Sequence, residues 1–129
     1  MAITLSTTGR NAACNGTVDA IDAGAAAGKL KLKSAGDVLL CTVTLNDPAF
    51  GDASGGVAAL DVSPALSSVG LAAAGAGTAA TKFDFTDSDD NVIFSGTVGV
   101  GSGELQMDNN SIAQDQVVNV TGYNHTQPA

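Results

Sequence analysis

Polar and apolar residues alternate along most of this chain, and the alternation predicts strands. The clearest case is the run Lys29-Leu30-Lys31-Leu32-Lys33. Because successive side chains of a strand point to opposite faces, the two leucines can enter a core while the three lysines stand together in solvent. The run therefore predicts a strand with a cationic row on one face, in a chain whose formal net charge is otherwise steeply negative.

Similar alternation predicts further strands, separated by turns rich in Gly, Asp and Asn. These strands cover residues 38–46, 57–62, 78–87, 92–98, 104–107 and 116–121. Residues 34–37 and 88–91 are predicted as the turns of two hairpins. The segment 38–46 is partly apolar on both faces, which predicts a central strand.

One segment, residues 8–23, has the spacing of a helix. Its larger apolar residues Cys14, Val18 and Ile21 recur at intervals of four and three, which places them on one stripe. One of the two threonines at its start is expected to cap the helix, and Gly24 to end it.

Other segments are predicted to lie around this body. Residues 1–6 are expected to form an N-terminal arm and residues 124–129 a loose tail. Residues 63–77, rich in Ala, Gly and Leu, are either a strand flanked by loops or an extended arm. The loop at 46–56 contains Phe50, which is too large and apolar to remain in water and is predicted to plug an end of the core.

Composition supports one mainly β domain covering residues 1–129. Of the 129 residues, 44% are hydrophobic but only 4% aromatic, so the core is built from many small pieces. The 16 glycines, with many Thr, Ser and Asn, disfavour a helical bundle. We expect a β-sandwich or jelly-roll-like fold with one short N-terminal helix and flexible arms.

Charge and hydropathy limit the kinds of partner and the cellular compartment that we expect for this chain. A net charge of −8 repels phosphate backbones, so no nucleic-acid partner is expected. Apolar runs fall short of the roughly 20 residues that span a bilayer, and no secretory signal is visible. A cytoplasm is therefore the expected place of synthesis, where Cys14 and Cys41 would remain reduced and buried.

The chain offers no convincing catalytic or metal-binding group, and we expect neither an enzyme nor a cofactor. The acidic run from Asp84 to Asn91 matches the first ligand positions of a calcium loop, but Val92 replaces the required glycine and Val98 the bidentate glutamate. A hairpin turn capped by Asp and Asn side chains explains the run more simply. The only histidine, His125, falls in the predicted tail, where nothing would orient it for acid–base work.

The lysine row has two interpretations. Lysines on an edge strand prevent other chains from adding to the sheet, which is the favoured interpretation. Alternatively, they meet acidic groups on a partner and set its register. The residues predicted to bind a partner are Lys29, Lys31, Lys33, Phe50, Leu66, Val69 and Leu71.

The order of segments from about Arg10 to Val120 resembles a family of small structural proteins of tailed bacteriophages. The resemblance rests on Arg10-Asn11-Ala12, Ile21-Asp22-Ala23-Gly24-Ala25, Gly28-Lys29-Leu30-Lys31, Thr44-Leu45-Asn46-Asp47-Pro48-Ala49-Phe50-Gly51, Phe83-Asp84-Phe85-Thr86-Asp87-Ser88-Asp89 and Asn91-Val92-Ile93-Phe94-Ser95-Gly96-Thr97-Val98-Gly99. The chain departs from the pattern at Asp90, where the family-like turn would have glycine.

This resemblance implies a capsid cement or decoration protein on the outside of the virion. Its expected partners are the major capsid protein and copies of itself, as a dimer or trimer. The alternative is a carbohydrate- or receptor-binding β-sandwich module of a head or tail fibre. The scarcity of aromatic residues disfavours this alternative, because sugar platforms need flat rings.

Overall fold

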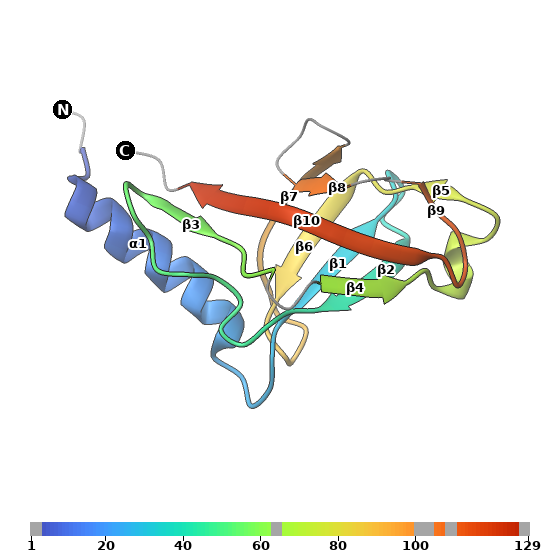
Figure 1. Cartoon of the computed structure of the whole chain (residues 1–129), viewed down its shortest axis with the longest axis horizontal. Coiled ribbons are helices and arrows are strands. Elements are labelled where there is room, and N and C mark those ends of the chain that lie inside the picture. Colours follow the sequence, from blue (N-terminus) through green and yellow to red (C-terminus); the bar gives the residue numbers. More distant parts are fainter. Residues whose placement is uncertain (1–3, 63–65, 100–104, 108–110, 127–129) are drawn as a thin grey trace.

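The strands stack in two layers. The computed structural model describes residues 4–62, 66–99, 105–107 and 111–126. The first layer is antiparallel, in the order β2 (Leu39–Thr44), β1 (Lys29–Lys33), β6 (Lys82–Thr86) and β7 (Val92–Gly99). The second layer contains β8 (Leu105–Met107), β10 (Val117–Thr126), β3 (Val57–Ala59) and β4 (Leu66–Val69). Figure 1 shows β10 lying across the strands of the first layer.

The two layers are joined along one side by β7 and β8, which pair in parallel. A separate small sheet pairs β5 (Thr78–Ala79) with β9 (Ser111–Ile112), a strand that the alternation did not predict. The predicted fold class is confirmed: the structure is mainly β and sandwich-like, with one short N-terminal helix.

The helix buries the predicted stripe. It comprises α1 (Thr7–Asp19) and a 3₁₀ turn, η1 (Ala20–Asp22), and the three residues Cys14, Val18 and Ile21 are all buried. The cap differs from the prediction, since the Ser6 hydroxyl accepts a 3.1 Å hydrogen bond from the Gly9 N–H. Among the described residues, no helix has the length and apolar character needed to cross a bilayer.

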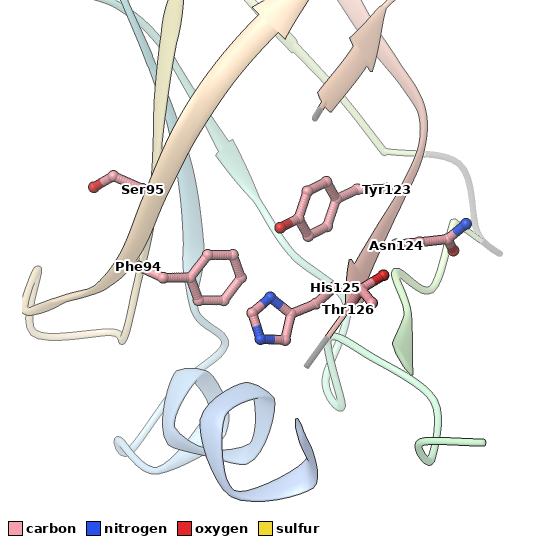
Figure 2. Close-up of a pocket in the computed structure, with 6 residues that line it drawn as sticks. All are labelled: Phe94, Ser95, Tyr123, Asn124, His125 and Thr126. Carbon is pink, nitrogen blue, oxygen red and sulfur yellow. The ribbon is translucent and has the colours of Figure 1, made fainter. Parts of the chain in front are cut away.

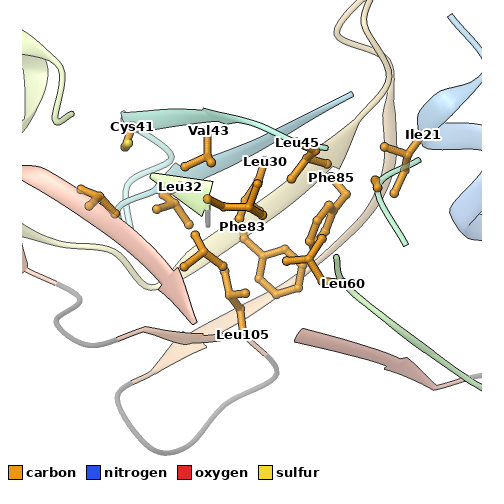
Figure 3. Packing of buried hydrophobic residues seen from close by; sticks show 14 of the residues in the cluster. Ile21, Leu30, Leu32, Cys41, Val43, Leu45, Leu60, Phe83, Phe85 and Leu105 are labelled. Carbon is orange, nitrogen blue, oxygen red and sulfur yellow. The ribbon is translucent and has the colours of Figure 1, made fainter. Parts of the chain in front are cut away.

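The strand β1 lies in the interior of its sheet, between β2 and β6. In this register Leu30 is opposite Phe85 and Leu32 is opposite Phe83, and all four side chains are fully buried. Figure 3 shows these four side chains in the core. The prediction that residues 38–46 form a central strand is wrong, because β2 pairs in the sheet with β1 alone.

The outer edge of β2 is nevertheless bonded to another segment of the chain. The N–H of Leu71 donates a 2.8 Å hydrogen bond to the carbonyl of Leu40. The 3₁₀ turn η2 (Ala72–Ala74) follows directly. The stretch 66–74 is thus a strand and a turn packed on the body, and the interpretation of 63–77 as an extended arm is wrong for these residues. Residues 63–65 lie outside the described residues.

Phe50 plugs the core as predicted. It is 5% exposed, and its ring centroid lies 5.5 Å from that of Phe85 and 6.0 Å from that of Tyr123. Phe83 and Phe94 complete this aromatic cluster. The few aromatic residues of the chain are therefore gathered in one place between the layers.

The predicted tail is partly a strand. Residues 124–126 end β10, where Asn124 lies opposite Ala59 and His125 opposite Ala58 of β3. The side chains here are polar, so backbone pairing with β3, together with the contact of His125 with Phe94, holds the segment. Residues 127–129 of the predicted tail and residues 1–3 of the predicted arm lie outside the described residues, whereas residues 4 and 5 are exposed and adopt neither helix nor strand.

Both cysteines are buried and free. The Cys14 thiol donates to the carbonyl of His125 at 3.4 Å, and the Cys41 thiol donates to the carbonyl of Val69 at 3.5 Å. Each thiol therefore links an element of the N-terminal part of the chain to the second layer.

Gly70, directly after β4, provides a test of this packing. A Cβ atom there would overlap the carbonyl oxygen of Ala113, which is backbone and cannot rotate away. We expect Gly70→Ala to lower the free energy of unfolding by about 1–3 kcal/mol, measured by urea denaturation. The control is Gly16→Ala in the middle of α1, where nothing lies within 4 Å of the added atom. This change should raise stability by roughly 0.5–1 kcal/mol, and equal effects of the two changes would contradict the packing.

Candidate functional site

The lysine row is paired within the molecule. Lys29 and Lys31 reach Oδ1 of Asp90 at 3.1 and 3.0 Å, and Lys33 reaches Oδ2 of Asp84 at 2.6 Å. Their side chains are only 20–32% exposed. Because β1 is an interior strand, the interpretation of the row as edge protection is wrong. A partner could use these lysines only in competition with the two carboxylates.

Asp84 is the most enclosed of these carboxylates. Burial alone would raise the pKa of its carboxyl group, but hydrogen bonds from Lys33 and Ser95, with the charges of Lys33 and Lys31, outweigh burial and hold the pKa below its ordinary value. The Ser95 hydroxyl donates to Oδ1 of Asp84 at 2.6 Å. The charged form of Asp84 is therefore built into the first layer.

The acidic turn after β6 is a capped hairpin turn, as predicted. Oδ1 of Asp87 accepts 2.9 Å hydrogen bonds from the N–H groups of Asp89 and Asn91, and Oδ2 accepts one from the Asn91 amide at 3.0 Å. These bonds from Asn91 and Asp89 hold the pKa of Asp87 below its usual range. Asp90 takes a positive φ of 68°, a conformation that favours glycine. This is the position at which the family-like turn would have that residue.

The apolar residues predicted to bind a partner divide into two groups. Phe50 and Leu66 are 5% and 3% exposed, so they belong to the core and present no surface. Val69 and Leu71 are 46% and 39% exposed. They lie two residues apart, with the buried Gly70 between them, and thus share the outward side of this segment.

The fold places one further exposed valine directly beside Val69 and another in the segment that leads into β2. Val117 is directly opposite Val69 in the β4–β10 ladder and is 61% exposed. Val38 is 45% exposed and lies two residues before Leu40, whose carbonyl is bonded to Leu71. We call Val38, Val69, Leu71 and Val117 the edge patch. Figure 1 shows β4 and the start of β10 at the end of the molecule opposite α1.

Sequence reasoning missed Val38 and Val117, although Val117 carried a signal. In β10 the buried residues are Val118 and Val120, so Val117 is the apolar residue of the opposite, outward register. No comparable signal marks Val38, because its exposure depends on the position of the turn that follows β1.

His125 is ordered, contrary to its predicted place in a loose tail. Its imidazole lies 4.6 Å from the ring of Phe94, tilted by 31°. Burial against this ring lowers the pKa of His125, so the neutral form dominates at neutral pH. The contact with Phe94 and the pairing of His125 in β10 orient the imidazole.

A pocket of about 320 Å³ opens beside His125, between β7 and the end of β10. The residues that line it are Phe94, Ser95, Tyr123, Asn124, His125 and Thr126. Figure 2 shows the rings of Phe94, Tyr123 and His125 converging, whereas the side chains of Ser95 and Asn124 point away. Those two residues therefore present mainly backbone to the pocket.

Comparisons of the chain with protein-family models, with curated proteins and with solved structures found no match.

The Lys33–Asp84 pair can be tested by a double-mutant cycle. Lys33→Met leaves the enclosed Asp84 carboxylate without its cation, and we expect unfolding free energy to fall by about 1–3 kcal/mol. Adding Asp84→Asn should restore part of the loss. Lys82→Met is the control, because the Lys82–Asp37 pair is exposed and should contribute within about 0.5 kcal/mol. Equal losses at Lys33 and Lys82 would contradict a special role for the enclosed pair.

The state of His125 predicts a pH dependence. Its pKa is lower in the folded than in the unfolded chain, so the unfolded chain binds more protons as the solution becomes acidic. The contribution of His125 to stability is complete above the unfolded pKa of about 6.5 and is lost as pH falls through the folded pKa. We expect NMR titration of the imidazole to give a pKa below about 6.5, and His125→Gln to flatten stability against pH in this window. A folded pKa at or above that value would contradict the burial of the ring.

Proposed function

We propose that this chain is a structural virion protein of a tailed bacteriophage. In this proposal it is a capsid cement or decoration protein, made in the bacterial cytoplasm, that binds the outside of the major capsid shell and stabilises it. It acts by binding and not by catalysis. The sequence runs that resemble small phage structural proteins support the proposal, and the edge patch is the structural observation on which it depends.

The edge patch suits docking because its apolar side chains gain by leaving water. Val69 and Val117 face solvent side by side on paired strands, and Leu71 continues the surface toward β2. Contiguous exposed apolar surface is typical of interaction sites on small soluble domains. Buried apolar area stabilises a contact by about 25 cal/mol per Å², so even a small patch contributes when many copies bind one shell.

The paired lysines change the role of charge in this proposal. Lys29, Lys31 and Lys33 are engaged by carboxylates of the β6–β7 hairpin, so they stabilise the fold before any partner is present. The net charge of −8 then keeps free copies apart and soluble. Docking through the apolar patch needs no exchange of these ion pairs.

The proposed partners are the major capsid protein and further copies of this chain, as a dimer or trimer. Stable contacts commonly bury about 1,600 Å² in total, more than the four residues of the edge patch supply alone. Symmetric association of copies on the shell would add the missing area, because each copy repeats the same contact around an axis.

A second candidate function is carbohydrate or receptor binding by a module of a head or tail fibre. The chain has few aromatic residues for such a role, but the structure gathers Phe94 and Tyr123 beside His125 around a pocket. Gene order distinguishes the candidates: a neighbouring major capsid gene favours the shell, and neighbouring fibre genes favour adhesion.

Particle assembly tests the proposal. Purified particles of the phage that encodes the chain should contain it on the outer surface of the head by mass spectrometry and cryo-electron microscopy. The double variant Val69→Asp/Val117→Asp should fold but lose at least about tenfold of its incorporation, because docking would bury two unpaired carboxylates. Absence of the wild-type chain from particles would refute the function.

The matched control is Val92→Asp. Val92 is 55% exposed, but it lies opposite Thr86, at the end of the first layer away from the edge patch. This variant should incorporate like the wild type. Normal incorporation of the double variant would refute the edge patch as the docking surface while leaving the virion role to be carried by another face.

A further inference from the structure

The pocket beside His125 is a feature that the proposed shell-binding function does not use. It opens where β8 no longer separates β7 from β10: β8 pairs with Val98 and Gly99 on one side and reaches only Tyr123 on the other. In the described part of the chain, no strand lies between the earlier residues of β7 and the later residues of β10. Rings from both strands wall the pocket there (Figure 2).

The walls favour an uncharged ligand with a ring. The rings of Phe94 and Tyr123 are nearly parallel, with centroids 6.0 Å apart, and the imidazole of His125 is tilted against Phe94. Phe94 and Tyr123 also pack on Phe85, with centroids 4.9 and 5.2 Å away, but both rings and His125 remain half-buried. The C–H groups of another ring can pack against the parts that stay exposed. None of the six described lining residues is Asp, Glu, Lys or Arg, so the described lining carries no permanent charge.

The polar groups of the pocket add direction to this apolar surface. A neutral imidazole offers one donor and one acceptor nitrogen, and the hydroxyl of Thr126 and the backbone of Ser95 and Asn124 lie at the rim. The net charge of −8 disfavours phosphates and other anions. A volume of about 320 Å³ is at the lower end of the range for small-molecule sites.

We propose that this pocket binds a single neutral sugar ring, such as the terminal unit of a glycan. The apolar face of the sugar packs on the exposed parts of Phe94 and Tyr123, and its hydroxyls exchange hydrogen bonds with the imidazole of His125. This combination of a C–H face and a hydroxyl edge matches an aromatic wall with a neutral polar rim better than a flat apolar molecule does.

The location of the pocket is compatible with attachment to a shell. The edge patch contains Val117 at the start of β10, and the pocket contains His125 near its end. Eight residue steps of a strand span about 26 Å. A copy docked through the edge patch would thus hold the pocket well away from the docking surface.

NMR titration tests the inference directly. The chain has one histidine and one tyrosine, so the ring signals of His125 and Tyr123 are identified by residue type alone. The probes are the methyl glycosides of glucose, galactose and N-acetylglucosamine, with tetramethylammonium as a cationic and N-acetylneuraminic acid as an anionic comparator. We expect at least one neutral glycoside to shift both ring signals saturably at millimolar concentration.

Two variants separate a specific site from a general effect. His125→Ala removes the proposed hydrogen bonds and should weaken binding by about tenfold. Phe94→Leu keeps apolar volume but removes a ring wall, and should weaken it similarly, whereas Lys82→Met at the far end of β6 should bind like the wild type.

The inference is overturned if no neutral glycoside shifts the two signals, if both folded variants bind as well as the wild type, or if only the cationic or anionic comparator binds. Proton spectra of each variant establish that it is folded. None of these outcomes affects the shell-binding proposal, which depends on the edge patch and on particle composition.

Discussion

The pairing of β1 with β6 is the interaction on which the rest of the structure depends. On one face of this pair Leu30 and Leu32 meet Phe85 and Phe83, and these contacts fill the space between the layers. The opposite face carries the lysine row and Asp84. One strand pair therefore supplies the apolar centre of the core and also keeps its charged residues in contact with solvent and with each other.

The sequence predicts which residues are buried better than it predicts which segments lie side by side. Alternation identifies β1 and the β6–β7 hairpin, and the helical spacing of apolar residues identifies the buried stripe of α1, because each depends on a local period. The edge position of β2 could not be predicted. Apolar residues on both faces of a strand indicate that both faces are buried, but they do not show whether a second strand pairs along its outer edge. Here Leu71, just before η2, bonds to that edge and follows β2 by about thirty residues along the chain.

The end of β10 shows the opposite failure. Residues 124–126 are polar and lack alternating apolar residues, so the sequence predicts a tail. They form a strand because their backbone pairs with β3, and this pairing depends on the tertiary structure alone. The aromatic pocket was missed for the same reason, since Phe94 and His125 approach only when β7 and β10 are both in place.

Because β10 pairs with β3, β4 and β8, all of which precede it in the chain, much of the second layer cannot close until β10 is made. Its longest-range pairing joins Thr126 to Val57, which requires a large loop to be ordered at an entropic cost. Sheets dominated by such distant pairings form slowly. A nascent chain that ends at β9 therefore lacks the strand that joins β3, β4 and β8 into one layer. Synthesis of β10 completes that layer and encloses the aromatic side chains between the two layers.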